Sequence, residues 1–566
     1  MLGKWEKSEL LLLFLLSCGA LCARGANILG LVTTPQGDNP AWTQPLFEAL
    51  AARGHSVTVL STAPVLKNSD ITHIPLQNDY DVVKKHFVDE GSGEYRDYWS
   101  FRHLQIWYEA MLGSCGSVLE ARLLKKPSSH QMQSLQVDFD LVIYDATYAW
   151  DCVLHMLLKQ RQVPVMGVSG GKLNTELLKV MRASDTINAA NIPHFISELP
   201  HAMGYWQRVH NHLLYLEEVF LRLAIASPVL RGLLKTDDFH HRVNLMLLNT
   251  HPALDYVQNM PPNILEVGGL HIRPHSRELS QSVEVFLEDY SEGVIYISLP
   301  RIELFPEMAR TAIIDVVASY RNYGIIWNLH NEELKNTIPV EKMTNLHIVQ
   351  VEPQAQQDIL AYSNVKAFIT HGDSFSLQEA IYNAIPVVVF PMLHDEINNA
   401  QRVKERSLGI TIAVKSFSYN SFSLALKRVL FDDHFSDAVH QAKLSFRNRA
   451  MSPVEEAVWH AEKLMTEPQI YDALSSPEAH SQNYFVRHSL DVLALPALFI
   501  LLFIFNVAFL IMQMIAGFKD MRKKKLEHEQ LLPKPRGKKS LKEAKYIPLR
   551  KQQKHDTHHT RVQKDE

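Results

Sequence analysis

The stretch VKAFITHGDSFSLQEAIYNAIPVVVFPMLHDEINNAQRV (residues 365–403) carries the pattern that decides the fold. An apolar run turns through Gly372 into a segment with helical spacing, and a second apolar run follows at 385–391. A strand that turns through glycine into a helix leaves unpaired backbone N–H groups where an anion such as phosphate binds. Asp373 puts a carboxylate at this position. The stretch therefore predicts an anion site that carries its own anion.

The same alternation of strands and helices extends over most of the chain. Further short apolar runs, separated by helical patterns, occupy 26–32, 55–61, 139–146, 163–169, 293–299, 323–329 and 345–351. Such alternation predicts an α/β fold with parallel, doubly wound sheets. Two Rossmann-like halves facing a cleft would bind ligands at the carboxyl ends of their strands. Neither GxGxxG nor GxxxxGK[ST] follows any of these runs, which argues against a dinucleotide or Walker site.

The two ends of the chain predict a membrane protein. Residues 1–25 read as a signal peptide, and 492–518 are apolar enough for one transmembrane helix. The tail at 519–566 holds 16 Lys and Arg against 7 Asp and Glu, and positive charge marks the cytosolic side. Between these segments we expect an N-terminal domain at 26–260 and a C-terminal domain at 261–488. The body would be lumenal, with one membrane helix and a basic cytosolic tail.

Cysteine usage leaves little room for a disulfide framework or a metal site. Of the four cysteines, Cys18 and Cys22 lie in or beside the signal segment, and Cys115 and Cys152 lie in the body. One disulfide between the last two can form. No CxxC pattern occurs, so we expect no metal.

The 365–403 stretch resembles the donor-binding signature of the membrane-bound animal UDP-glycosyltransferases, the glucuronosyltransferase-like enzymes. ALAARGHSVTVLS, PPNILEVGGLHI, EGVIYISL and MSPVEEAVW resemble other landmarks of that family, in the same order. The resemblance implies a GT-B fold, an acceptor domain followed by a UDP-sugar domain, and inverting, metal-independent transfer of a sugar to a small lipophilic molecule. It implies no cofactor beyond the co-substrate UDP-sugar, no nucleic acid, and an endoplasmic reticulum membrane enzyme of detoxification.

The resemblance assigns the diphosphate and ribose contacts. In the family, the positions held here by His371, Gly372 and Ser376 contact phosphate, and that of Glu379 binds the ribose. Ser376 and Glu379 also form an S-x-x-E capping box, which would organise this helix with no ligand. Both interpretations stay open, and they are compatible.

Several donor positions depart from the family. Its H-G-G-x-N-S pattern has Asp373 at the second glycine and Phe375 at the asparagine here, and its SLGS reads SLPR at 298–301. Ser298 is kept as a donor-site candidate, but Pro300 removes an N–H and fixes φ. Arg301 is either a replacement cation for phosphate or a solvated surface charge.

The uracil and sugar positions are also altered. The family's W-x-P-Q lacks its Trp here, and the Gln is Gln354 counted forward from Asn345 or Gln356 counted back from Asp358. At the sugar end, the family's Asp-Gln reads Asp395 and Glu396. A second carboxylate would repel glucuronate, so a neutral hexose is expected. Alternatively, these two acids only stabilise the start of a helix.

The catalytic pair is incomplete. Asn39 stands where the family has its base His, whereas the partner aspartate is kept as Asp145. An amide cannot take a proton. Two hypotheses follow: a UDP-glycosyltransferase with a base-poor mechanism, or a catalytically impaired, membrane-anchored relative that binds a lipophilic ligand or a partner transferase. Homo- or hetero-oligomers with related transferases stay open.

Overall fold

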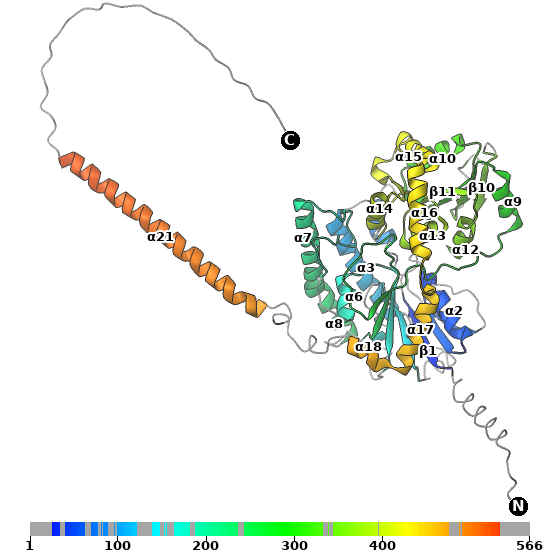
Figure 1. Ribbon diagram of the computed structural model, residues 1–566, viewed down its shortest axis with the longest axis horizontal. Coiled ribbons are helices and arrows are strands. Elements are labelled where there is room, and N and C mark those ends of the chain that lie inside the picture. The colour runs from blue at the N-terminus through cyan, green and yellow to red at the C-terminus, as the bar shows by residue number, and fades with distance from the viewer. Residues whose placement is uncertain are drawn as a thin grey trace, which may run out of the picture. The chain divides into compact units, whose positions relative to one another are not determined.

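The computed structural model describes residues 25–33, 40–62, 70–76, 81, 83–88, 95–96, 99–120, 138–147, 152, 154–155, 163–181, 187–235, 243–331, 335, 338, 343–351, 353–393, 395–474, 486 and 490–531. The chain divides into two compact units, Met1–Ser481 and Gln482–Glu566. The first unit is the α/β body, and the second contains one long helix. Each is described by itself (Figure 1).

The first half of the body is built on a seven-stranded parallel sheet in the order β3-β2-β1-β4-β5-β6-β7. Strands β1, β4, β5 and β6 are almost entirely buried, as expected for parallel strands covered on both faces. The strands are β1 Asn27–Val32, β2 Ser56–Ser61, β3 Ile71–Pro75, β4 Leu141–Asp145, β5 Val165–Ser169, β6 Leu245–Leu248 and β7 Ile264–Glu266. The helical elements are η1 Pro40–Thr43, α2 Gln44–Ala52, η2 Val83–Phe87, α3 Ser100–Glu120, α6 Thr175–Val180, α7 Tyr205–Leu221, η3 Arg222–Ala226 and α8 Ser227–Leu234.

The second half has a six-stranded parallel sheet in the order β10-β9-β8-β11-β12-β13. Its strands are β8 Val294–Ser298, β9 Gly324–Asn328, β10 Leu346–Val349, β11 Val365–Thr370, β12 Val387–Val389 and β13 Gly409–Thr411. Its helical elements are α9 Gln281–Asp289, η4 Ile302–Leu304, α10 Glu307–Ser319, α12 Pro353–Leu360, α13 Ser374–Asn383, α14 Asp395–Glu405, η6 Val414–Ser416, α15 Tyr419–Phe431 and α16 Asp433–Arg447. Apolar clusters cover both faces of this sheet, so the predicted pair of doubly wound halves is confirmed.

The halves do not divide where the sequence suggested. Strand β7 pairs with β6 in parallel, so the first sheet extends past the expected boundary at 260/261. After α16 the chain returns to the first half as α17 (Pro453–Thr466) and α18 (Pro468–Leu474). Figure 1 shows α17 beside β1 and α2. The buried residues Val458, Ala461 and Leu464 of α17 join the apolar cluster on one face of the first sheet.

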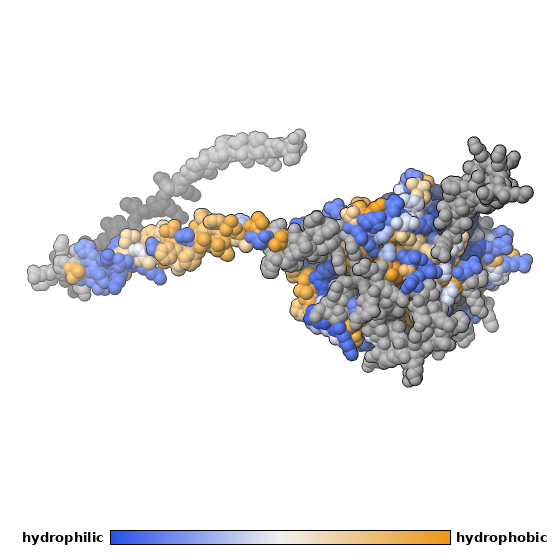
Figure 2. Space-filling model, turned by 90° about the horizontal axis from the view of Figure 1, so that it is seen from below, coloured by the Kyte–Doolittle hydropathy of each residue, from blue (hydrophilic) through white to orange (hydrophobic). Residues whose placement is uncertain are grey.

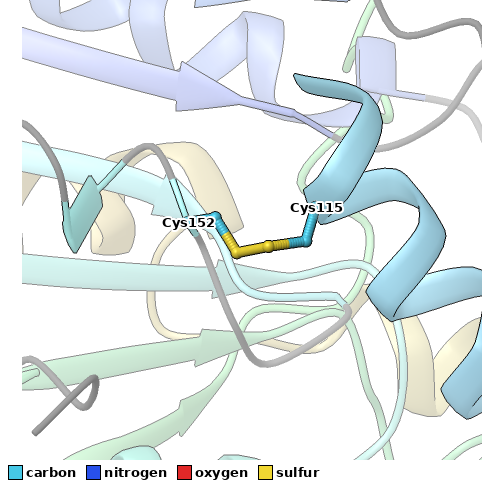
Figure 3. Close-up of a disulfide and its surroundings, with 2 residues drawn as sticks. All are labelled: Cys115 and Cys152. Carbon is cyan, nitrogen blue, oxygen red and sulfur yellow. A yellow bond between two sulfur atoms is a disulfide. The ribbon is translucent and has the colours of Figure 1, made fainter. Parts of the chain in front are cut away.

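A disulfide joins two segments of the first half. Cys115 of α3 pairs with Cys152, with their Cα atoms 5.7 Å apart (Figure 3). Both side chains are buried and pack against Leu230 of α8. The pairing that the sequence left open is therefore formed.

The second unit contains the helix α21, Leu490–Leu531. By length and hydropathy it can cross a membrane, and it includes the predicted span at 492–518. The helix continues beyond that span through the basic run at 522–525, and Figure 2 shows its orange apolar band giving way to blue at the C-terminal end. The polar Asn506 donates to the carbonyl of Leu502 at 2.8 Å, which satisfies an amide group within the apolar stretch.

Candidate functional site

The turn between β11 and α13 is shaped around a glycine and a buried histidine. Gly372 has φ +87°, and a Cβ there would lie 2.5 Å from Val389, so a side chain does not fit. The Nδ1 of His371 donates to the carbonyl of Phe390 at 3.0 Å, and its Nε2 accepts from the backbone N–H of Arg301 at 3.3 Å. Burial and the nearby Arg301 charge lower the pKa of His371 well below its usual value. The imidazole is therefore neutral.

Asp373 is the N-cap of α13, and this corrects one interpretation of the sequence. The helix begins at Ser374, and the Asp373 carboxylate accepts from the backbone N–H of Ser376 at 3.0 Å. The capping box proposed for Ser376 and Glu379 is wrong, because Ser376 already lies within the first turn. Burial raises the pKa of Asp373, while its hydrogen bonds with Ser376 oppose that shift. The anion at this helix start is thus the chain's own cap.

The expected ribose-binding carboxylate is held by a glutamine from α12. The Nε2 of Gln356 lies 3.1 Å from Oγ of Ser376 and 2.7 Å from Oε2 of Glu379, and donates to these acceptors. Burial raises the pKa of Glu379 to about 8. The side chain of Gln354 lies outside the described residues. Of the two candidate glutamines, Gln356 is the one that the structure brings to Glu379.

Arg301 is neither a solvated surface charge nor free to meet a phosphate. Its guanidinium forms an ion pair with the buried carboxylate of Glu396 at the start of α14. Glu396 also accepts from the backbone N–H groups of Met392 and Leu393, each at 2.9 Å. Burial raises the pKa of Glu396 to about 7, although Arg301 lowers it. The residue expected to bind sugar hydroxyls is instead engaged by its own loop.

Asp395, the other expected sugar contact, is held in a similar way. Its Oδ2 accepts from Oγ of Ser374 and from Nδ2 of Asn399, both at 2.8 Å. Ser298 is the last residue of β8 and pairs with Thr370, the last residue of β11, so it lies at the strand ends that precede the Gly372 turn.

Within the described ranges, no group of three or more His, Cys, Asp or Glu residues is placed to hold a metal ion.

Phe375 connects the second half of the body to the first. Its ring lies 6.2 Å from that of Trp42, measured between centroids, and a Cβ on Gly170 would come within 3.0 Å of its tip. On its own side it meets His271 edge-on at 5.2 Å. An apolar contact between the halves thus occupies the position where the family has a polar amide.

The acceptor side presents Asp145 at the carboxyl end of β4. This buried carboxylate accepts from the backbone N–H of Thr147 at 2.9 Å and from its hydroxyl at 2.5 Å. The Thr147 hydroxyl in turn accepts from the backbone N–H of Gly170, in the loop after β5, at 3.1 Å. Asn39 lies outside the described residues, so its relation to Asp145 remains a prediction.

The sequence analysis did not identify Lys172 as a site residue. Lys172 also lies in the loop after β5. Its side chain is buried, and Nζ donates to Oδ1 of Asn398 at 3.0 Å and to Oδ1 of Asn399, both on α14. A lysine following two glycines at the end of an apolar strand was the available signal. Parallel strand ends face the ligand side of a sheet, so this position pointed to the cleft.

Comparison with known proteins agrees with this geometry. The family described as "UDP-glucoronosyl and UDP-glucosyl transferase" matches residues 35–527. UDP-glucosyltransferase 2 of Dactylopius coccus is 25% identical over 471 residues, covering 80% of this chain and 87% of the relative. Human UDP-glucuronosyltransferase 1A9 is 27% identical over 347 residues, covering 59% and 62%.

Two solved structures match the fold at low sequence identity. A UDP-glucose:anthocyanidin 3-O-glucosyltransferase in complex with UDP aligns with TM-score 0.51 and 14% identity, covering 78% of this chain and 99% of that one. The glycotransferase of kitacinnamycin aligns with TM-score 0.50 and 15% identity, covering 78% and 100%. These matches confirm the GT-B fold. The chain belongs to the UDP-glucuronosyl and UDP-glucosyl transferase family and is, by that membership, a glycosyltransferase.

Proposed function

We propose that the protein transfers a neutral hexose from a UDP-sugar to a small lipophilic acceptor by inverting, metal-independent displacement. The observation that carries the proposal is the β11–α13 turn, where Gly372 keeps its positive φ and neutral His371 is buried behind it. Glu379 lies further along α13 and is bonded to Gln356 of α12. In this proposal the turn receives the diphosphate, while Glu379 receives the ribose hydroxyls.

The chemistry requires one bond to form as another breaks. The acceptor oxygen attacks the anomeric carbon, the bond from that carbon to the diphosphate oxygen breaks, and UDP leaves with the electron pair. The acceptor proton must pass to a base, for which Asp145 is the available carboxylate. Asn39 cannot take that proton, so acidic acceptors such as phenols are the expected substrates.

The choice of a neutral hexose rests on the charge at the start of α14. Asp395 and Glu396 place two carboxylates there. The nearby cations are already engaged, because Arg301 is paired with Glu396 and the buried Lys172 is bonded to the side-chain amides of α14. A glucuronate carboxylate would add a further negative charge at this end of the site. Glucose or another neutral hexose avoids that repulsion.

We further propose that the body is lumenal in the endoplasmic reticulum and that α21 crosses the membrane. The Cys115–Cys152 disulfide supports an oxidising compartment for the body, and the basic run at 522–525 supports a cytosolic tail. Protease added to intact microsomes should then remove only the segment after about residue 519. Digestion of the body with protection of the tail would overturn this topology.

A second candidate function is favoured by one specific feature of the cleft. The expected donor contacts are engaged within the chain: Asp373 caps α13, Arg301 pairs with Glu396, and Phe375 packs against Trp42. A protein built in this way could bind a lipophilic ligand or a partner transferase without turning over a UDP-sugar.

Donor binding separates the two candidates. A ligand that binds only the folded state stabilises it by about 2.7 kcal/mol at a concentration 100 times its Kd. We expect UDP and UDP-glucose to raise the melting temperature of the full-length protein in detergent, and UDP-glucose to support glucosylation of a simple phenol. Absence of any shift at millimolar UDP and UDP-sugar would reject the transferase proposal and leave the second candidate.

A further inference from the structure

Lys172 crosses from the acceptor half of the body to the donor half. It lies in the loop after β5, and its ammonium donates to Asn398 and Asn399 in the first turns of α14. The side chain is only 5% exposed. A buried ammonium loses its hydration, so its place depends on these two amide oxygens. Separating the two halves would break both hydrogen bonds.

In the second half of the body, Asn399 is also bonded to residues of the candidate donor site. Its Nδ2 lies 3.0 Å from the carbonyl of Gly372, 3.2 Å from Oγ of Ser374 and 2.8 Å from Oδ2 of Asp395. With Lys172 holding the amide oxygen, the amide nitrogen is turned toward the β11–α13 turn and the first carboxylate of α14. The orientation of one amide thus joins the expected phosphate and sugar positions.

On the acceptor side, the same loop is bonded to the Asp145 segment. Gly170, two residues before Lys172, donates its N–H to the Thr147 hydroxyl, and that hydroxyl donates to Asp145. A continuous path of covalent and hydrogen bonds therefore leads from Asp145 through the Lys172 loop to Asp395. It runs from the first half of the body to the second.

The buried surroundings of Lys172 change its pKa. Burial lowers the pKa of Lys172 to about 7, and the Arg402 charge lowers it as well, whereas Asp255 and Asp395 raise it. Arg402 is itself bonded to Asn398 and lies 3.8 Å from Asp255. Asn398 also donates to the carbonyl of Ser197 in the first half at 2.7 Å. The contact is thus part of a buried polar interface.

We propose that Lys172 is a positioning residue that sets the start of α14 against the Asp145 loop, so that the donor site is complete only while this cross-cleft contact holds. Lys172 acts through Asn399 and does not itself touch the reacting atoms. The kinetic part of this inference rests on the proposed transferase function, whereas the structural part does not.

Hydrogen exchange on the ligand-free, full-length protein in detergent tests the structural part. Lys172→Met keeps a similar side-chain length but removes the ammonium. We expect at least tenfold faster amide exchange in both 169–174 and 395–401 in this variant. Lys404→Met, which removes an exposed lysine at the other end of α14, should leave both segments unchanged. Unchanged exchange at 395–401 in a folded Lys172→Met variant would overturn the proposal, whether or not the protein binds UDP.

Steady-state kinetics separate positioning from a general loss of folded protein. We expect Lys172→Met to raise KM for the UDP-sugar at least tenfold and to leave KM for the acceptor within about twofold. A smaller active fraction would lower kcat and leave both KM values unchanged, and that outcome contradicts a positioning role. If the unmodified protein shows neither UDP binding nor turnover, the transferase proposal fails, and the exchange experiment alone decides the role of Lys172.

Discussion

The two sheet edges that face the cleft hold their carboxylates in different ways. On the acceptor side, Asp145 accepts hydrogen bonds from Thr147, two residues further along the chain. On the donor side, Glu379 is bonded to Gln356 and Glu396 to Arg301, which are 23 and 95 residues away. A local turn therefore contributes to placing Asp145, whereas Glu379 and Glu396 also depend on side chains that are distant in the sequence.

The difference predicts how each side responds to substitution. Asp145 is bonded to a residue two positions away, and the resemblance places the substituted base at residue 39. The donor-side carboxylates Glu379 and Glu396 are instead bonded to side chains of distant segments. We therefore expect one substitution to raise turnover on the acceptor side, and several to be needed to tighten donor binding.

The largest expected effect concerns the acceptor side. Asn39→His would supply the base that the resemblance assigns to position 39, and general-base catalysis typically contributes about 100- to 10,000-fold in rate. We expect turnover of aliphatic alcohols to rise by a factor in this range, because alcohols need a positioned base more than phenols do. Initial rates with UDP-glucose and a matched alcohol and phenol measure the effect.

The control for this substitution is Asp145→Asn in the same background. Residues that act as a unit lose most of the gain when either is removed. If the unmodified protein already turns over alcohols as fast as Asn39→His, a base exists elsewhere and the assignment of position 39 is wrong.

The next largest effect concerns the Arg301–Glu396 pair. Arg301→Met leaves a buried carboxylate without its cation, and breaking a buried pair in this way typically costs about 3–5 kcal/mol. We expect urea denaturation to show a loss of this size, with most of it recovered when Glu396→Gln is added. Arg321→Met, at an exposed position, is the matched control. If Arg301→Met and Arg321→Met lower the free energy of unfolding by the same small amount, the Arg301–Glu396 pair contributes little to stability.

A smaller effect is expected at the α13 cap. A unit charge about 4 Å from a phosphate costs roughly 4 kcal/mol at an effective dielectric near 20, and burial, which raises the pKa of Asp373, reduces this charge. Asp373→Asn keeps a capping oxygen and removes the charge, so we expect UDP to bind about tenfold more tightly by calorimetry. Asp373→Gly should tighten binding similarly, at a cost of a few tenths of a kcal/mol in stability.

Phe375→Asn added to either variant should tighten UDP binding further, because it replaces the ring that packs on Trp42 with the amide of the family. If neither position 373 nor the double variant changes UDP affinity, charge repulsion is not what limits donor binding. Pro300 would then be the next position to change.

The sequence predicted the local features of this molecule better than the distant ones. The glycine turn at Gly372 and the nine expected strands are present, because apolar runs and a positive φ depend on neighbouring residues. Four short strands, β3, β6, β7 and β13, were not predicted, since runs of three to five residues carry little periodicity. The return of α17 to the first sheet was missed for a different reason: an amphipathic helix does not say which sheet it covers.

The candidate site shows the same division between local and distant contacts. The order of strands and helices predicted which residues lie at the strand ends. It did not predict which side chains those residues contact. The choice between Asp373 and Ser376 as the cap depends on placing the start of a helix to within three residues, which the sequence pattern did not do. The contacts of Arg301, Phe375 and Lys172 join segments from different elements, so no local sequence pattern predicts them.

The smallest predicted effect tests the electrostatics of the donor edge through pH. Burial raises the pKa of Glu379 to about 8, whereas an unfolded glutamate titrates near its ordinary value of about 4.3. His271, whose Nε2 lies 3.7 Å from the Glu379 carboxylate, has its own pKa lowered to about 4 by burial, so it supplies no positive charge near neutral pH. Between about pH 4.3 and pH 8 the folded protein holds a proton that the unfolded chain has lost. The stability contributed by this group is therefore complete below about pH 4.3 and is lost as the pH rises through 8.

Glu379→Gln removes this titration and keeps an oxygen for the Gln356 amide, so its melting temperature should match the unmodified protein at pH 5 and exceed it by a few degrees at pH 8. The exposed Glu288→Gln on α9 should show no such dependence on pH. A variant less stable than the unmodified protein at pH 8 would mean that the Glu379 carboxylate is ionised and stabilised in the folded state. The proposal of a neutral Glu379 would then be wrong.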